Sequence, residues 1–108
     1  MQGLNLPLRI ETVGRDGALV VVVQGELDMA TSPQLDEALA EARDTNAASI
    51  LVDLKGVSFI DSTGLNVLMR HVCAEDDRAR FRLTRASAQA QRLFQLTGTS
   101  KYLRFVPE

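Results

Sequence analysis

Cysteine, histidine and tryptophan are almost absent from this chain of 108 residues, which has one cysteine, one histidine and no tryptophan. A single cysteine, Cys73, excludes an intramolecular disulfide and offers no thiolate cluster for a metal ion. The longest apolar run, Ala18 to Val23, is far shorter than the about twenty residues that cross a bilayer. We therefore expect no metal, no cofactor and no membrane insertion.

An excess of basic charge is also missing, since twelve basic residues face fourteen acidic ones and the net charge is −2. This balance argues against a nucleic-acid partner, whose phosphates require a basic surface. Apolar residues make up 45%, enough for a folded core. The start of the chain lacks the charged and apolar regions of a signal peptide. We expect a single cytoplasmic domain over residues 1–108, with residues 1–7 as a loosely held tail.

Strand-like apolar runs recur along the chain and are separated by helical patterns. The first two runs flank a turn at residues 14–17 and predict a hairpin, after which residues 25–31 break the pattern. We expect strands over Leu8–Val13, Ala18–Gln24, Ile50–Leu54, Ala79–Thr84 and Leu103–Val106. In the fourth, Phe81 and Leu83 point inward.

Three segments have the features of helix starts. Ser32-Pro33 predicts a helix with Ser32 as N-cap, Asp36 and Glu37 in its first turn, and an end near residues 44–46. Ser87 caps the last helix, and Gly98 follows its end. The middle helix follows Ile60 and has its apolar stripe at Leu65, Leu68, Met69 and Val72; we expect it to end by the acidic residues 75–77.

The resulting order, β-β-α-β-α-β-α-β, predicts an α/β fold. Strands that alternate with helices are joined by right-handed crossovers and pair in parallel. We therefore expect one mixed, mostly parallel sheet with an antiparallel N-terminal edge and helices packed against it.

The most informative segment is Asp61-Ser62-Thr63-Gly64, at the start of the middle helix. Backbone N–H groups and the positive end of the helix dipole favour an anion there. Ser62 can therefore accept a phosphate, or it can be an ordinary N-cap serine.

These residues resemble a known family. Phe59-Ile-Asp-Ser-Thr-Gly-Leu65 is similar to the phosphorylation segment of STAS domains, in particular of bacterial anti-sigma factor antagonists. Gly25-Glu-Leu-Asp-Met-Ala-Thr31 is similar to the family's Gly-Glu-x-Asp loop, and Leu96-Thr97-Gly98 to its third helix end. The resemblance covers Leu8 to Val106, although the family's glycine-rich turn before the fourth strand is replaced by the charged residues 75–80.

The resemblance implies a switch controlled by phosphorylation. The unmodified protein binds an anti-sigma factor that is also a serine kinase, and thereby frees a sigma factor. Phosphorylation of Ser62 then dissociates the complex, and a PP2C-type phosphatase resets it. A monomer or weak dimer is expected.

The expected partner-binding residues surround Ser62. Thr63 is the second candidate acceptor. Asp61 orients the hydroxyl or caps the helix, while Gly64 lets another backbone come close. Asp28 and Glu26 reach the same sheet edge, where Asp28 alternatively forms an Asx turn. The full set is Glu26, Asp28, Asp61, Ser62, Thr63, Gly64 and Asn66.

Two other functions are weighed against the switch. A hydrolase that uses Ser62 as nucleophile needs a base within hydrogen-bond reach, but His71 is about 13 Å along the helix and half a turn round it. We therefore expect no enzyme. The other alternative is a STAS scaffold or an accessory subunit of a stress-signalling or transporter assembly. Cys73 is expected to be buried and unreactive, and Asp53 to form a turn.

Overall fold

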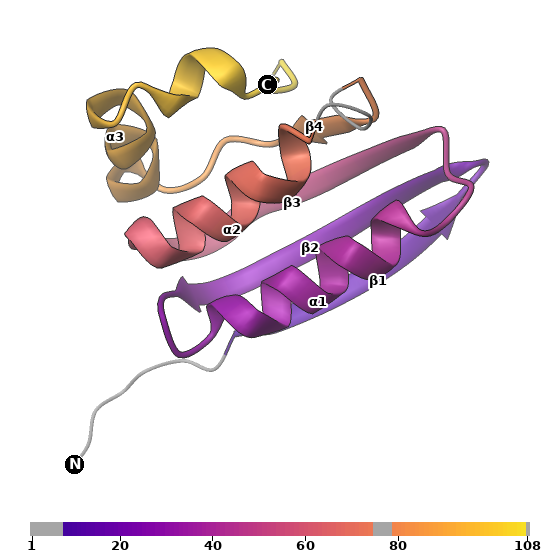
Figure 1. Cartoon of the computed structure of the whole chain (residues 1–108), viewed down its shortest axis with the longest axis horizontal. Coiled ribbons are helices and arrows are strands. Elements are labelled where there is room, and N and C mark those ends of the chain that lie inside the picture. The colour runs from indigo at the N-terminus through magenta and orange to yellow at the C-terminus, as the bar shows by residue number, and fades with distance from the viewer. Residues whose placement is uncertain (1–7, 75–78, 108) are drawn as a thin grey trace.

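One mixed sheet in the order β1-β2-β3-β4 organises the fold (Figure 1). The computed structural model describes residues 8–74 and 79–107. β1 (Arg9–Arg15) and β2 (Ala18–Leu27) form the antiparallel hairpin, whereas β3 (Ser49–Ile60) pairs in parallel with β2 and with β4 (Phe81–Leu83). The predicted α/β class, with its antiparallel N-terminal edge, is confirmed.

The two central strands are longer than predicted. β2 runs through Gly25 to Leu27, where we expected a break, because the register with β3 shifts on either side of Gln24 and Gly25. Gly25 has φ 111°, which side chains rarely allow, and so forms an irregularity within the strand instead of ending it. β2 and β3 therefore end together, with Leu27 paired to Ile60.

α1 (Ser32–Arg43) and α2 (Ser62–Val72) lie side by side over one face of the sheet (Figure 1). The predicted start of α1 is off by one residue, because Thr31 is the N-cap and makes no side-chain capping bond. Asp36 and Glu37 consequently fall in the second turn, not the first. α2 ends at Val72, before the acidic residues 75–77, which lie outside the described residues.

The C-terminal part differs from the prediction in its last element. Ser87 caps α3 (Ala88–Leu96) as expected, and Gly98 has a left-handed conformation. The 3₁₀ helix η1 (Thr99–Tyr102) follows. The expected strand over 103–106 is reduced to one parallel bridge, Leu83 to Phe105, which forms at the last residue of the short strand β4.

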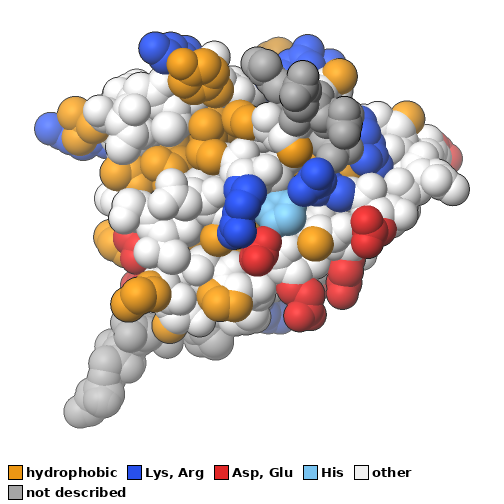
Figure 2. Space-filling model, in the orientation of Figure 1, with side chains coloured by type: hydrophobic (Ala, Val, Ile, Leu, Met, Phe, Trp, Pro, Cys, Tyr) orange, Lys and Arg blue, Asp and Glu red, His pale blue; other side chains and the backbone are white. Residues whose placement is uncertain are grey.

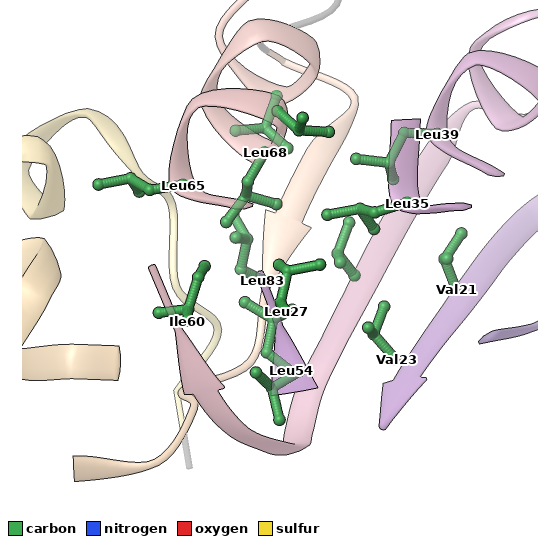
Figure 3. Close-up of a cluster of buried hydrophobic side chains, with 14 of the residues drawn as sticks. Val21, Val23, Leu27, Leu35, Leu39, Leu54, Ile60, Leu65, Leu68 and Leu83 are labelled. Carbon is green, nitrogen blue, oxygen red and sulfur yellow. The ribbon is translucent and has the colours of Figure 1, made fainter. Parts of the chain in front are cut away.

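The core lies between the sheet and its helices. Leucine and valine side chains from β2, β3, β4, α1 and α2 meet there (Figure 3). The alternating pattern of β4 buries Phe81 and Leu83 as predicted, and leaves Arg82 exposed on the opposite face. No helix of the described residues is long and apolar enough to span a bilayer. The largest fully buried side chains include Phe81, Phe94, Leu27, Leu35, Leu39, Ile50, Leu54, Ile60, Leu68 and Leu83.

Candidate phosphorylation site at the start of α2

Ser62 is the first residue of α2, and its side chain is exposed. The capping is done by its neighbour, because Asp61 Oδ1 accepts a hydrogen bond from Gly64 N at 2.9 Å. The interpretation of Ser62 as an ordinary N-cap serine is therefore wrong. Its hydroxyl makes no hydrogen bond within the described part of the chain, so it is accessible to another molecule.

Gly64 packs the first turn of α2 against the end of β2. A Cβ atom at this position would lie 2.7 Å from Leu27 Cγ, closer than real contacts allow, and 3.0 Å from Leu27 O. The Asp61 N–H donates to the same Leu27 carbonyl at 3.0 Å. The expectation that Gly64 lets a backbone come close is met, but this residue is buried and thus cannot itself contact a partner.

Asp28 follows Leu27 and begins the loop that leads to α1. Its Oδ1 accepts hydrogen bonds from Ala30 N and Thr31 N, both at 3.0 Å, which makes the Asx turn considered from the sequence. Thr31 Oγ1 accepts from Asp28 N at 2.9 Å and donates to Glu26 O at 2.8 Å. These bonds make the loop rigid.

The structure brings the two predicted segments together at one edge. Because Leu27 pairs with Ile60, Asp28 and Asp61 leave neighbouring parallel strands at the same level. Glu26 and Thr63 are half-buried there, and Asn66 is exposed one turn after Ser62 on the same side of α2. The predicted residues, with the exception of Gly64, can thus contribute to one surface.

Gln89 is a site residue that the sequence reasoning missed. Its Oε1 accepts from Ile60 N and its Nε2 donates to Ile60 O, both at 3.0 Å. β4 is too short to reach this part of β3, so the side chain takes the place of a neighbouring strand. A glutamine on an exposed helix position gives no sequence signal for such a contact.

Two large apolar side chains also lie exposed at this edge. Met29, beside Asp28, is 74% exposed, and Phe59, which pairs with Glu26, is 39% exposed. Burial of apolar surface is the main driving force of association. Met29 therefore adds an exposed apolar side chain to the loop that lies beside the start of α2, as a protein interface requires.

His71 is buried between the two helices and is not available to Ser62. Its Nε2 lies 2.6 Å from Asp36 Oδ1, and its Nδ1 lies 3.2 Å from Arg43 Nη1. Since an arginine only donates, Nδ1 accepts and the ring proton lies on Nε2. The hydrogen bond from His71 lowers the pKa of Asp36, helped by the charge of Arg70 and opposed by desolvation.

Cys73 and Asp53 have structural contacts. Cys73 is only half-buried, contrary to prediction, because it follows the end of α2, where its Sγ donates to Tyr102 O at 3.6 Å. Asp53 lies within β3, contrary to the expected turn, and its Oδ1 accepts from Lys55 N at 3.0 Å where the register with β2 shifts. Among residues 8–74 and 79–107, no group of three or more His, Cys, Asp and Glu side chains is placed to hold a metal ion.

Comparison with known proteins agrees with this geometry. The family model described as "Mlab, STAS domain" matches residues 10–107. An anti-sigma-B factor antagonist of Staphylococcus aureus is 39% identical over 93 residues, which cover 84% of this chain and 85% of the relative.

Solved structures give the same answer. An anti-sigma factor antagonist from Mycobacterium paratuberculosis has a TM-score of 0.84 at 28% identity, covering 97% of this chain and 92% of that one. SpoIIAA in its unphosphorylated form has a TM-score of 0.69 at 22% identity, covering 94% of this chain and 89% of that one. Bacillus SpoIIAA in its phosphorylated form has a TM-score of 0.64 at 23% identity, covering 94% of this chain and 92% of that one. Both SpoIIAA structures share the fold of this chain. The chain therefore belongs to the STAS-domain family of anti-sigma factor antagonists.

Proposed function

We propose that this chain binds an anti-sigma factor while Ser62 is unmodified, and so releases a sigma factor. The anti-sigma factor is also the serine kinase that phosphorylates Ser62, and a PP2C-type phosphatase restores the hydroxyl. The observation that carries the proposal is the exposed Ser62, whose hydroxyl has no hydrogen-bond partner among residues 8–74 and 79–107 because Asp61 caps the helix.

Ser62 is favoured over Thr63 as the phosphate acceptor. Ser62 is exposed, whereas Thr63 is half-buried, and a kinase must enclose the hydroxyl that it phosphorylates. Ser62 also follows directly after Asp61, as in the family segment that the sequence resembles. We therefore assign the modification to Ser62.

The physical effect of the phosphate falls on the surface, not on the fold. A phosphoserine adds about −1.5 to −2 charges and three acceptor oxygens. The first turn of α2 tolerates an anion, but the Asp61 carboxylate beside it repels one. An interface formed around a neutral hydroxyl would also have to desolvate the phosphate. A loss of about 3 kcal/mol weakens binding more than a hundredfold.

The partner-facing surface consists of the two rigid segments at the ends of β2 and β3. Glu26, Asp28, Asp61, Thr63 and Asn66 supply its polar groups. Gly64 is not part of this surface, but its lack of a side chain allows α2 to pack closely against Leu27. Because both segments are fixed by internal hydrogen bonds, partner binding costs little ordering entropy.

Intact-mass spectrometry tests this assignment. The chain is incubated with its cognate anti-sigma kinase and ATP, alongside Ser62→Ala and Thr63→Ala. We expect the unsubstituted chain and Thr63→Ala to gain one phosphate, and Ser62→Ala to gain none. A phosphate that persists in Ser62→Ala and is lost in Thr63→Ala moves the switch to Thr63. No gain in any of the three favours the scaffold alternative.

A further inference from the structure

Charge is unevenly distributed along the chain, and residues 79–107 contain no acidic side chain at all. The same segment has six basic residues, whereas residues 8–74 have ten acidic and five basic ones. Not all six are available to a partner. Arg80 donates to the carbonyls of Arg43, Thr45 and Ala47, so it holds the end of α1. The basic residues are Arg80, Arg82, Arg85, Arg92, Lys101 and Arg104.

Apolar side chains gather beside some of these cations, between α2 and α3. Figure 2 shows hydrophobic side chains exposed in the space between these two helices. Leu96, in the last turn of α3, is 73% exposed, and Tyr102 of η1 is 52% exposed. Met69 of α2 and Leu93 of α3 are partly buried beside the core. We call these four residues the α2–α3 surface.

Contacts along both helices place the four residues on one side of the molecule. Gln89 contacts Ile60 at the end of β3, two residues before α2 begins, and Leu93 and Leu96 follow Gln89 on the same side of α3. Cys73 contacts the Tyr102 carbonyl, so the side of α2 that also carries Met69 borders η1. The four apolar side chains therefore face the region between α2, α3 and η1.

The rim of this surface is basic. Lys101 Nζ lies 5.4 Å from the ring centroid of Tyr102. Arg92 is exposed on α3, next to Leu93. Arg70 is exposed on α2, although its guanidinium also lies 3.7 Å from Asp36. α2, α3 and η1 themselves contain no acidic residue, although Asp36 of α1 offsets the charge of Arg70.

We propose that the α2–α3 surface docks an amphipathic segment of the anti-sigma partner, with acidic residues on either side of large apolar ones. This inference rests on the proposed function. An exposed apolar surface of this kind marks an interaction site. A surface between two helices accommodates the apolar face of a third, and the basic rim selects a partner of opposite charge.

The docking site and the phosphorylation site are connected. α2 begins at Ser62, and Gln89 ties the start of α3 to Ile60, so the α2–α3 surface begins beside the phosphate acceptor. A phosphate on Ser62 would repel an acidic segment bound along α2. The acidity of the partner thus explains why phosphorylation releases it.

Titration calorimetry with the purified cognate anti-sigma factor tests the surface. Arg92→Glu and Leu96→Ser should each weaken binding about tenfold or more. Matched controls are Arg82→Glu, on the opposite face of the sheet, and Val13→Ser, an exposed apolar residue of β1. The controls should change the affinity less than about twofold. Equal effects for the surface variants and their controls would overturn the inference.

The salt dependence of the affinity tests whether charge repulsion causes the loss of binding. Between about 0.1 M and about 1 M salt the Debye length falls from about 10 Å to about 3 Å. The difference in affinity between the unsubstituted chain and Ser62→Asp should narrow over this range. A difference that stays constant contradicts repulsion by an acidic partner segment.

Two further results distinguish the possible failures. If Ser62→Asp weakens binding but Arg92→Glu and Leu96→Ser do not, the docking inference fails and the switch stands. If the surface variants weaken binding but Ser62→Asp does not, the switch fails. Loss of binding to phosphatidylglycerol vesicles in the surface variants, with unchanged affinity for the anti-sigma factor, assigns the surface to a membrane and overturns the inference.

Discussion

The side-chain amide of Gln89 makes two hydrogen bonds to the backbone of Ile60, one to its N–H and one to its carbonyl. Gln89 thus gives β3 a hydrogen-bonding partner at Ile60, whereas β4 pairs only with residues 50–52 of β3. The position of Ser62, the proposed phosphate acceptor, therefore depends on a side chain of α3.

Removing this contact should destabilise the domain. Gln89→Met keeps the length of the side chain but leaves two backbone groups of Ile60 without partners, at a cost of about 2 kcal/mol. Urea unfolding followed by circular dichroism measures the change. Gln95→Met, at an exposed position of the same helix, is the control and should cost less than about 0.5 kcal/mol. Equal stabilities of the two variants would show that Gln89 holds nothing in place.

Gly64→Ala should be destabilising despite the better helix propensity of alanine. The gain in helix propensity is at most about 1 kcal/mol. The new Cβ atom would lie 2.7 Å from Leu27 Cγ, and the overpacking should cost about 1–3 kcal/mol of stability. Gly14→Ala is the control, because its Cβ atom would make an ordinary 3.7 Å contact. A variant at Gly64 with unchanged thermal stability contradicts the close approach of α2 to β2.

Asp61 combines a cap with a charge, and two substitutions separate them. Asp61→Ala removes the hydrogen bond to Gly64 N and should cost about 1 kcal/mol. Asp61→Asn keeps an acceptor and should lose much less. Chemical denaturation gives both values. If Asp61→Asn is as unstable as Asp61→Ala, the charge contributes the stability and the capping assignment is wrong.

Acid should weaken the packing of α1 against α2 through Asp36. The hydrogen bond from His71 lowers the pKa of this carboxyl, so its contribution to stability is complete above the ordinary aspartate pKa of about 3.9. That contribution is lost as the pH falls through the lower, folded-state value. Asp36→Asn should therefore flatten the fall in unfolding free energy below about pH 4.

The control for the acid experiment is Glu41→Gln, which removes an exposed carboxyl from the same helix. It should keep the steep loss of stability of the unsubstituted chain. Identical pH profiles for Asp36→Asn and the unsubstituted chain would mean that the His71 contact adds nothing to stability.

Local patterns were enough to predict most helix boundaries. Ser87 and Gly98 were identified because capping side chains and left-handed glycines act within a few residues of a helix end. The same principle located α2 and its first residue, Ser62. Local patterns did not decide which of Asp61 and Ser62 caps the helix, because aspartate and serine are both common N-cap residues.

Features that depend on distant residues were missed. β2 continues through Gly25 because β3 supplies backbone partners, which a local pattern of turn residues does not reveal. Gln89 is 29 positions away from Ile60, and no periodicity links them. The last strand was predicted from an apolar run, but only the bridge at Phe105 is formed.

The central claim is that the charge state of the Ser62 side chain decides whether this chain holds its partner. Titration calorimetry of Ser62→Ala and Ser62→Asp against the cognate anti-sigma factor tests it most directly. Ser62→Ala should bind like the unmodified chain, and Ser62→Asp at least about tenfold more weakly, equivalent to about 1.4 kcal/mol. Equal affinities for two variants that are both fully folded would contradict the account.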